Sequence, residues 1–118
     1  MKNEEFQHQV ALIDWWDLYA LKNKLPKELL FSIQNGARTS IGTAKRLKAS
    51  GGRRGVPDLM LAICHGIHPG LFIEMKRPGG SVSQDQREMI DLLRWQGYTC
   101  VVAKGWEEAM KEIEKYLK

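Results

Sequence analysis

The chain has 118 residues, of which 43% are hydrophobic and 27% are charged. This size and composition are typical of one globular domain. No apolar run approaches the ~20 residues that a membrane-spanning helix needs, and the polar N-terminus lacks the apolar segment of a signal peptide. We therefore expect one cytoplasmic domain over residues 1–118. Cys64 and Cys100 lie in apolar stretches, so we expect reduced core residues and not a disulfide or a metal pair.

Positive charge is concentrated in one segment. The net charge is only +4, but no acidic residue occurs between Glu28 and Asp58. The basic residues in this interval are Arg38, Lys45, Arg46, Lys48, Arg53 and Arg54. Such a run is often an ordinary solvated helix face. Its position directly before Asp58, the first carboxylate of a candidate metal site, favours a surface that contacts the phosphate backbone of nucleic acid.

The first third of the chain predicts a helix followed by a short strand. The helix covers residue 4 to about 22 and has a broad apolar face. The residues expected on that face are Phe6, Val10, Leu12, Ile13, Trp16 and Tyr19. Pro26 ends the helical region. Residues 29–34 then alternate weakly and close at Asn35-Gly36, which indicates a short strand ending in a turn.

The middle of the chain predicts a second helix and then two strands. Thr39 or Ser40 is a suitable cap for a helix that runs to about Ala49. Residues 58–64 and 71–76 are apolar runs of strand length. The short segment between them has the length of a connecting turn, so the two strands are expected to pair as a hairpin.

The last third predicts helix, strand, helix. Ser83 is a plausible N-cap for a helix over residues 84–96. Its expected inward residues are Met89, Ile90, Leu92 and Leu93. A β-branched strand follows over residues 98–103, and a final helix over residues 106–117. The whole order predicts an α/β domain with one sheet flanked by helices.

The two middle strands place Asp58, Glu74 and Lys76 together. Asp58 opens the first strand, and the hairpin brings Glu74 beside it. Because side chains alternate along a strand, Glu74 and Lys76 point to the same face. Two carboxylates so placed hold a hard divalent cation through oxygen ligands, and metal, carboxylates and an amine are what phosphodiester hydrolysis requires. The pattern indicates a nuclease, and the alternative is a Glu–Lys ladder on the surface of the sheet.

The first helix supplies two further candidates. Glu5, Gln9, Leu12 and Trp16 share one helical stripe that begins polar and becomes core. Glu5 and Gln9 therefore lie where the helix passes the edge of the core, within reach of a site in the sheet. The alternative for Glu5 is an acidic residue favoured by the helix dipole.

Four motifs resemble, in order, those of the virus-type replication-repair nuclease (VRR-NUC) domain, a family of the PD-(D/E)XK nuclease superfamily. They are Glu5-x-x-x-Gln9, Gly55-Val56-Pro57-Asp58-Leu59, Glu74-Met75-Lys76 and Ser83-x-x-Gln86. The resemblance runs from about residue 4 to residue 110, and no core position departs from the pattern. It implies a restriction-endonuclease-like α/β core with a mixed central sheet flanked by helices. The absence of an additional domain resembles the short stand-alone members from phage and bacteria.

The resemblance also implies a role for each motif residue. The implied ligands of Mg²⁺ or Mn²⁺ are Asp58, Glu74, the backbone carbonyl of Met75, and Glu5, the last directly or through a metal-bound water. Lys76 would orient the attacking water or stabilise charge in the transition state. The implied accessory residues of the catalytic site are Gln9 and Gln86.

These features together predict a metal-dependent DNA endonuclease. By analogy with the family, we expect a homodimer that cuts branched DNA such as Holliday junctions, because two sites related by a two-fold suit paired nicks. A flap or fork nuclease of the same fold is the alternative within this class. A basic DNA-binding module without catalysis is the alternative outside it, and the intact set of Asp58, Glu74 and Lys76 argues against that alternative.

Overall fold

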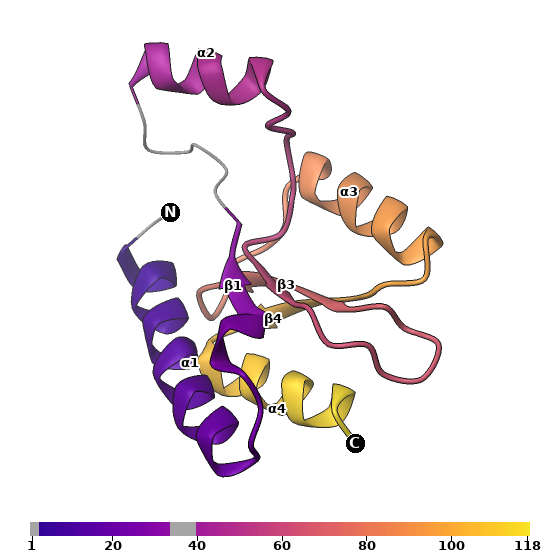
Figure 1. The fold of residues 1–118 in the computed structure, drawn as a ribbon. Coiled ribbons are helices and arrows are strands. Elements are labelled where there is room, and N and C mark those ends of the chain that lie inside the picture. The colour runs from indigo at the N-terminus through magenta and orange to yellow at the C-terminus, as the bar shows by residue number, and fades with distance from the viewer. Residues whose placement is uncertain (1–2, 34–39) are drawn as a thin grey trace.

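The computed structural model describes residues 3–33 and 40–118, and its elements follow the expected order (Figure 1). The elements are α1 (Asn3–Lys22), the 3-10 turn η1 (Lys27–Leu29), β1 (Leu30–Ser32), α2 (Ile41–Ala49), β2 (Leu59–Leu61), β3 (Leu71–Lys76), α3 (Gln84–Trp95), β4 (Thr99–Lys104) and α4 (Trp106–Tyr116). No helix in this described part of the chain is long and apolar enough to span a membrane.

The four strands form one mixed sheet in the order β1-β2-β3-β4. β1 pairs with β2, and β2 with β3, in antiparallel fashion. β3 and β4 are parallel, which requires a crossover, and α3 provides it. The expected hairpin of β2 and β3 is confirmed, with Leu59 opposite Ile73. The mixed central sheet that the family resemblance implied is confirmed as well.

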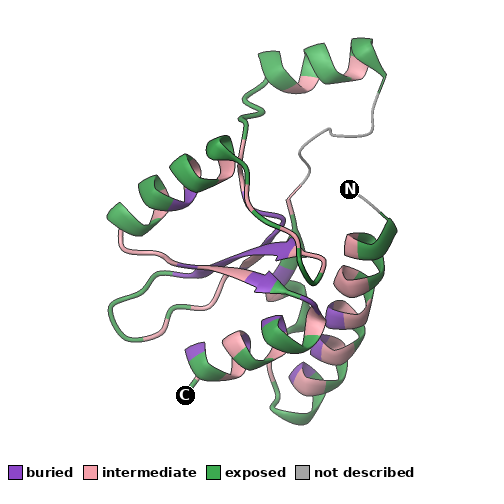
Figure 2. Ribbon diagram, turned by 180° about the vertical axis from the view of Figure 1, so that it is seen from behind, coloured by how far each residue is buried: buried purple, intermediate pink, exposed green. Residues whose placement is uncertain are grey.

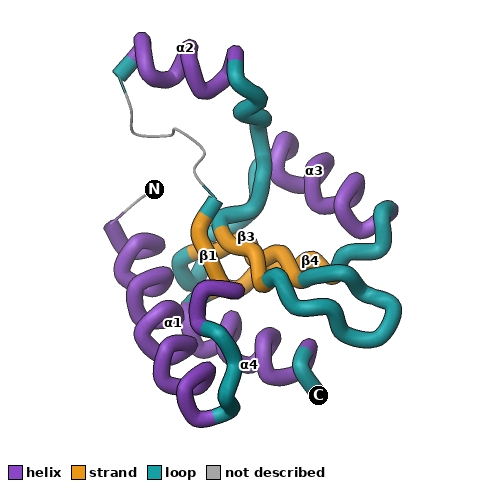
Figure 3. Tube along the Cα trace, viewed as in Figure 1, coloured by secondary structure: helices purple, strands orange, loops and turns teal. Residues whose placement is uncertain are grey.

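Helices cover both faces of this sheet (Figure 3). Alternate residues of β3, namely Leu71, Ile73 and Met75, belong to the larger core cluster, which α1 and α4 close with residues such as Trp16 and Ile113. Their neighbours along the strand face the other way, where Phe72 packs with Ile90 of α3 and Cys100 of β4. Glu74 and Lys76 share the face of Phe72 because of the same alternation.

The helix α2 stands away from this body (Figure 1). Ser40 caps this helix by accepting a hydrogen bond from the Thr43 N–H at 3.2 Å. Ser40 is one of the two residues that the sequence predicted as the cap. None of its residues is buried, and Figure 2 shows it exposed almost throughout. Arg38 lies outside the described residues, as do Asn35-Gly36 and Thr39.

Several expected burial assignments are wrong. Phe6 and Val10 are 57% and 42% exposed, because α1 packs through the narrower stripe of Leu12, Trp16 and Ala20. Leu92 is also exposed, since Ile90 is the residue that α3 buries.

The expectation for the cysteines holds in part. Both are free, but Cys64 is exposed while Cys100 is buried. β2 ends at Leu61, three residues earlier than expected, and the carbonyl of Ile63 accepts a hydrogen bond from the Tyr116 hydroxyl instead of a strand partner. Cys64 therefore lies in the loop after β2 and not inside the sheet.

Candidate active site

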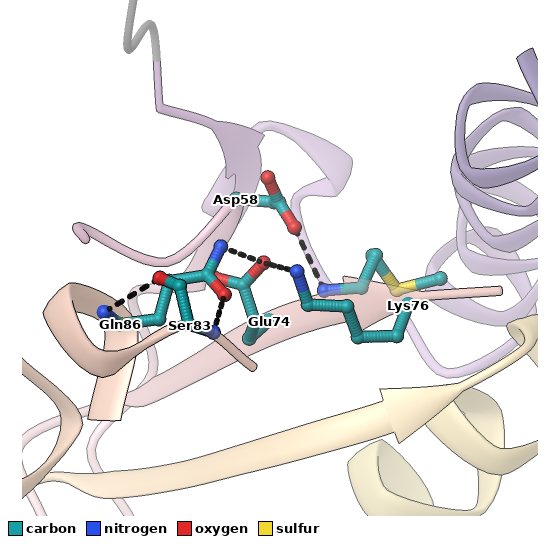
Figure 4. Close-up of polar contacts among 6 residues, drawn as sticks. Asp58, Glu74, Lys76, Ser83 and Gln86 are labelled. Carbon is teal, nitrogen blue, oxygen red and sulfur yellow. Dashed lines mark hydrogen bonds and ion pairs between the residues drawn. The ribbon is translucent and has the colours of Figure 1, made fainter. Parts of the chain in front are cut away.

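The antiparallel pairing of β2 and β3 brings two carboxyl groups together. Asp58 directly precedes β2, and continuing the register from Leu59 opposite Ile73 places it beside Glu74. The Asp58 Oδ2 accepts a hydrogen bond from the Met75 N–H at 2.8 Å, which fixes this carboxyl against β3 (Figure 4). Asp58 and Glu74 are only 8% and 2% exposed, and they are the buried polar or charged residues of ranges 3–33 and 40–118.

The loop before Asp58 depends on the glycine at position 55. Gly55 has φ +79°, in the left-handed region, and a Cβ there would lie 2.2 Å from the backbone oxygen of Asp85. Only a residue without a side chain lets the loop pass so close to the first turn of α3. Gly55 therefore holds Asp58 and the start of α3 in one place.

The start of α3 in turn holds Glu74. Ser83 and Gln86 form a capping box, in which the Gln86 N–H donates to the Ser83 hydroxyl and the Ser83 N–H donates to Gln86 Oε1. With its oxygen fixed in this way, the Gln86 side chain donates from Nε2 to Glu74 Oε2 at 3.2 Å. The sequence predicted Ser83 as the cap and Gln86 as a site residue, and the capping box is what connects them.

Lys76 lies on the same side as Glu74, as the strand alternation predicted. Its Nζ is 3.7 Å from Glu74 Oε2, and both side chains are largely buried. Figure 4 shows Glu74 between Gln86 and Lys76, with the carboxyl of Asp58 facing the pair. The other oxygen, Glu74 Oε1, is buried and has no hydrogen-bond partner among the described residues.

Burial and mutual repulsion oppose ionisation of the two carboxyls. Burial, followed by the charge of the neighbouring Asp58, raises the pKa of Glu74 to about 9. Burial also raises the pKa of Asp58, against the lowering effect of the hydrogen bond from the Met75 N–H and of the Lys76 charge. Ionisation of both carboxyls is therefore costly, even with Lys76 beside Glu74, and a bound divalent cation would favour it.

This donor set fits a hard divalent cation. The unpartnered Glu74 Oε1 is a buried oxygen with a free coordination position, and a bound cation would offset the repulsion between the carboxylates. Glu5 on α1 is half-buried, and its charge contributes to raising the pKa of both Asp58 and Glu74. However, within the described ranges no three His, Cys, Asp or Glu side chains converge as a ready metal-binding group. Glu5 therefore faces the pair from the adjacent helix without joining it.

The remaining expected residues differ in their relation to this pair. Gln9 is half-buried on α1, and its Oε1 has no hydrogen-bond partner in the described part of the chain. Lys48, Arg53 and Arg54 line a hollow of about 390 Å³ that also includes Gln86, and so borders the site. Lys45 and Arg46 are exposed on α2 and do not line that hollow.

One contact near the site follows from no pattern in the sequence. His8 of α1 accepts a hydrogen bond through Nδ1 from the Trp106 N–H at 3.1 Å. The only signal for it is indirect: Gly105, just before α4, has no side chain to cap that helix.

Comparison with known proteins agrees with the overall fold. A solved structure described as a VRR-NUC domain protein has a TM-score of 0.83 and 28% sequence identity, with 99% of this chain and 90% of that chain covered. The search of curated proteins gave no match. The mixed sheet with flanking helices matches the fold of the solved VRR-NUC domain protein.

The family model of the VRR-NUC domain matches residues 3–107, which is most of the chain. The protein therefore belongs to the VRR-NUC domain family, as the four motifs predicted. Membership in this family implies a nuclease-type function with DNA as the substrate.

Proposed function

We propose that this protein is a metal-dependent DNA endonuclease that cuts branched DNA. The observation that carries the proposal is the buried pair of Asp58 and Glu74, with one free carboxylate oxygen and an amine 3.7 Å from the other oxygen. Nothing in the packing of the core requires two adjacent buried carboxyls. Their desolvation is costly unless a cation is bound, and that cost points to a function in the site.

Asp58 and Glu74 are the proposed ligands of Mg²⁺ or Mn²⁺, assisted by Glu5 and by the backbone carbonyl of Met75. When bound, the cation would activate water and polarise the scissile phosphate. The Met75 N–H keeps the Asp58 carboxyl oriented, and Gln86 does the same for Glu74 through Oε2. Both carboxyls thus keep oxygen atoms available on a preorganised frame.

Lys76 is the proposed electrostatic catalyst. Strand alternation keeps its amine on the side of Glu74, and its stem is largely buried, so the charge has little freedom to move away. Negative charge develops on the phosphate oxygens during hydrolysis, and a fixed ammonium beside them stabilises that charge. The accessory role proposed for Gln9 is to complete the polar wall that α1 presents to the site.

The basic segment is the proposed contact with DNA. Lys48, Arg53 and Arg54 border the site through the shared hollow, so a strand bound there passes Gln86 on its way to the carboxylates. Lys45 and Arg46 extend the positive surface along α2, and Arg38 belongs to the same proposed surface. The preference for branched DNA and the pairing of two copies as a homodimer rest on analogy within the family.

A cleavage assay on a panel of DNA structures tests this proposal. Linear duplex, a flap, a replication fork and a four-way junction, each end-labelled, are incubated with Mg²⁺, with Mn²⁺ and with EDTA. We expect cleavage that needs a divalent cation and is fastest on the four-way junction, and sedimentation that shows a dimer. Fastest cleavage on the flap or fork would reassign the substrate within the class. Binding without cleavage under all metal conditions would identify a DNA-binding module and contradict the enzymatic assignment.

A further inference from the structure

The turns of α1 that carry Glu5 and Gln9 have little apolar anchoring. Phe6 and Val10, the large apolar residues in these turns, are exposed. The first fully buried residue of the helix is Leu12. Glu5 nevertheless lies close enough to Asp58 and Glu74 for its charge to act on both. A polar contact therefore has to hold this end of the helix in place.

His8 makes that contact. Its Nδ1 accepts the hydrogen bond of the Trp106 N–H at 3.1 Å, between residues 98 positions apart. Trp106 is the first residue of α4, and the preceding Gly105 provides no side-chain cap. The first N–H groups of a helix lack partners within the helix, and Ser, Thr, Asp or Asn usually supplies one. Here an imidazole from another helix does so.

The same contact reaches the strand that carries the site. The Gly105 N–H donates to the carbonyl of Lys76 at 2.9 Å. A Cβ at Gly105 would be 3.5 Å from His8 Cε1, so the ring packs directly against this backbone. Glu5 and His8 are neighbours on the helix surface because they are three residues apart. Two successive hydrogen bonds therefore link the turn of Glu5 to the end of β3.

We propose that His8 is a positioning residue, which caps α4 in order to hold Glu5 and Gln9 against the carboxylates of the site. The inference rests on the proposed nuclease function. His8 does not contact the reacting groups in this role. It fixes the distance between α1 and β3. Residues that orient metal ligands without binding the metal typically affect metal affinity or activity by about 10–100-fold.

Two substitutions that each introduce an amide side chain separate the role of the Nδ1 hydrogen-bond acceptor from the role of side-chain volume. His8→Asn places an amide oxygen one bond from Cγ, where Nδ1 was, and so keeps an acceptor for the Trp106 N–H. His8→Gln moves the oxygen one atom further out and removes that acceptor. Gln7→Ala, at the exposed neighbouring position, is the matched control.

The first readout is amide hydrogen exchange at Trp106, measured by NMR on the metal-free protein. We expect exchange to become about tenfold faster or more in His8→Gln and to stay near wild type in His8→Asn and Gln7→Ala. Unchanged exchange in His8→Gln would overturn the proposed cap. This readout does not depend on cleavage.

The second readout is function, as Mn²⁺ affinity by calorimetry and as kcat and KM on the four-way junction. In His8→Gln we expect Mn²⁺ affinity and kcat each to fall by about 10-fold or more, with KM for DNA within about twofold, and recovery of both in His8→Asn. Faster Trp106 exchange with normal Mn²⁺ affinity and kcat would overturn the positioning role alone. A wild-type protein that neither binds Mn²⁺ nor cleaves DNA would overturn the proposed function as well.

Discussion

The carboxylate pair and the basic helix α2 are held in the structure in opposite ways. Asp58 and Glu74 are buried and oriented by bonds from Met75 and Gln86. α2 has no buried residue, and its basic side chains are exposed. Buried charges respond strongly to their immediate partners, whereas exposed charges act mainly through a field that salt screens. Substitutions should therefore separate chemistry from DNA binding.

The largest expected effect is on chemistry alone. Glu74→Ala removes the proposed metal ligand and its free oxygen, so we expect cleavage to be abolished. DNA binding should be retained or strengthened, because the basic segment that makes the proposed phosphate contacts is unchanged. Cleavage assays and electrophoretic mobility shifts measure the two properties. Glu88→Ala, at an exposed position on α3, is the control. Loss of binding together with cleavage, in a folded variant, would show that Glu74 is structural.

Lys76→Met tests the charge beside the pair. The substitution keeps the apolar length of a largely buried stem and removes the ammonium. We expect Mn²⁺ affinity close to wild type by calorimetry, and a cleavage rate lower by about 10²–10³, the usual effect of one stabilising group. A rate near wild type would remove Lys76 from the catalytic site.

The double substitution Lys45→Glu and Arg46→Glu tests the exposed region. If both residues bind phosphates, the dependence of log affinity on log salt should flatten by roughly 0.9 for each phosphate that is no longer neutralised. The cleavage rate at saturating DNA should change little. Lys111→Glu with Lys115→Glu, both exposed on α4, is the charge-matched control. An unchanged slope would make this part of α2 an ordinary solvated face.

The smallest effect concerns the stability of the metal-free protein. Glu74 has a pKa of about 9 in the folded chain against an ordinary value of 4.5, so the folded state binds more protons than the unfolded state between these values. Stability is therefore full below about pH 4.5 and falls as the pH rises toward 9. Glu74→Gln removes this titration. In EDTA at pH 8 we expect it to melt roughly 5 °C higher than wild type.

Thermal unfolding at pH 5 and pH 8, followed by circular dichroism, measures this effect. The difference between the variant and the wild type should shrink at pH 5, because this pH is close to the ordinary pKa of 4.5 and ionisation of Glu74 favours the unfolded chain much less there than at pH 8. It should also shrink at pH 8 when Mg²⁺ stabilises the wild type. If the difference in melting temperature between Glu74→Gln and the wild type were the same at pH 5 and pH 8, the raised pKa of Glu74 would be contradicted.

The central geometry of the site was predictable because it depends on local rules. Alternation along β3 places Glu74 and Lys76 on one face, and the short connection to β2 brings Asp58 beside them. Ser83 and Gln86 follow a capping-box spacing that the sequence displays. For these residues, distance along the chain is enough to determine distance in space.

Features that depend on distant segments were not predictable in this way. Helical periodicity shows which residues share a stripe, but not how wide a stripe the sheet covers, and Phe6 and Leu92 were therefore placed in the core wrongly. The close approach of Gly55 to Asp85 and the bond from Trp106 to His8 need the positions of whole elements. A single sequence contains no periodic signal for either contact.

The parallel pairing of β3 with β4 has a consequence for the synthesis of the protein. Every residue assigned to the carboxylate site precedes β4 in the chain, yet β3 relies on β4 along its whole length, from Leu71 opposite Thr99 to Lys76 opposite Lys104. As the chain leaves the ribosome, Asp58 and Glu74 emerge before the segment that completes their sheet. We expect the nascent chain to remain inert until residues 99–104 have joined the sheet, so that the proposed site is assembled only after β4 has left the ribosome.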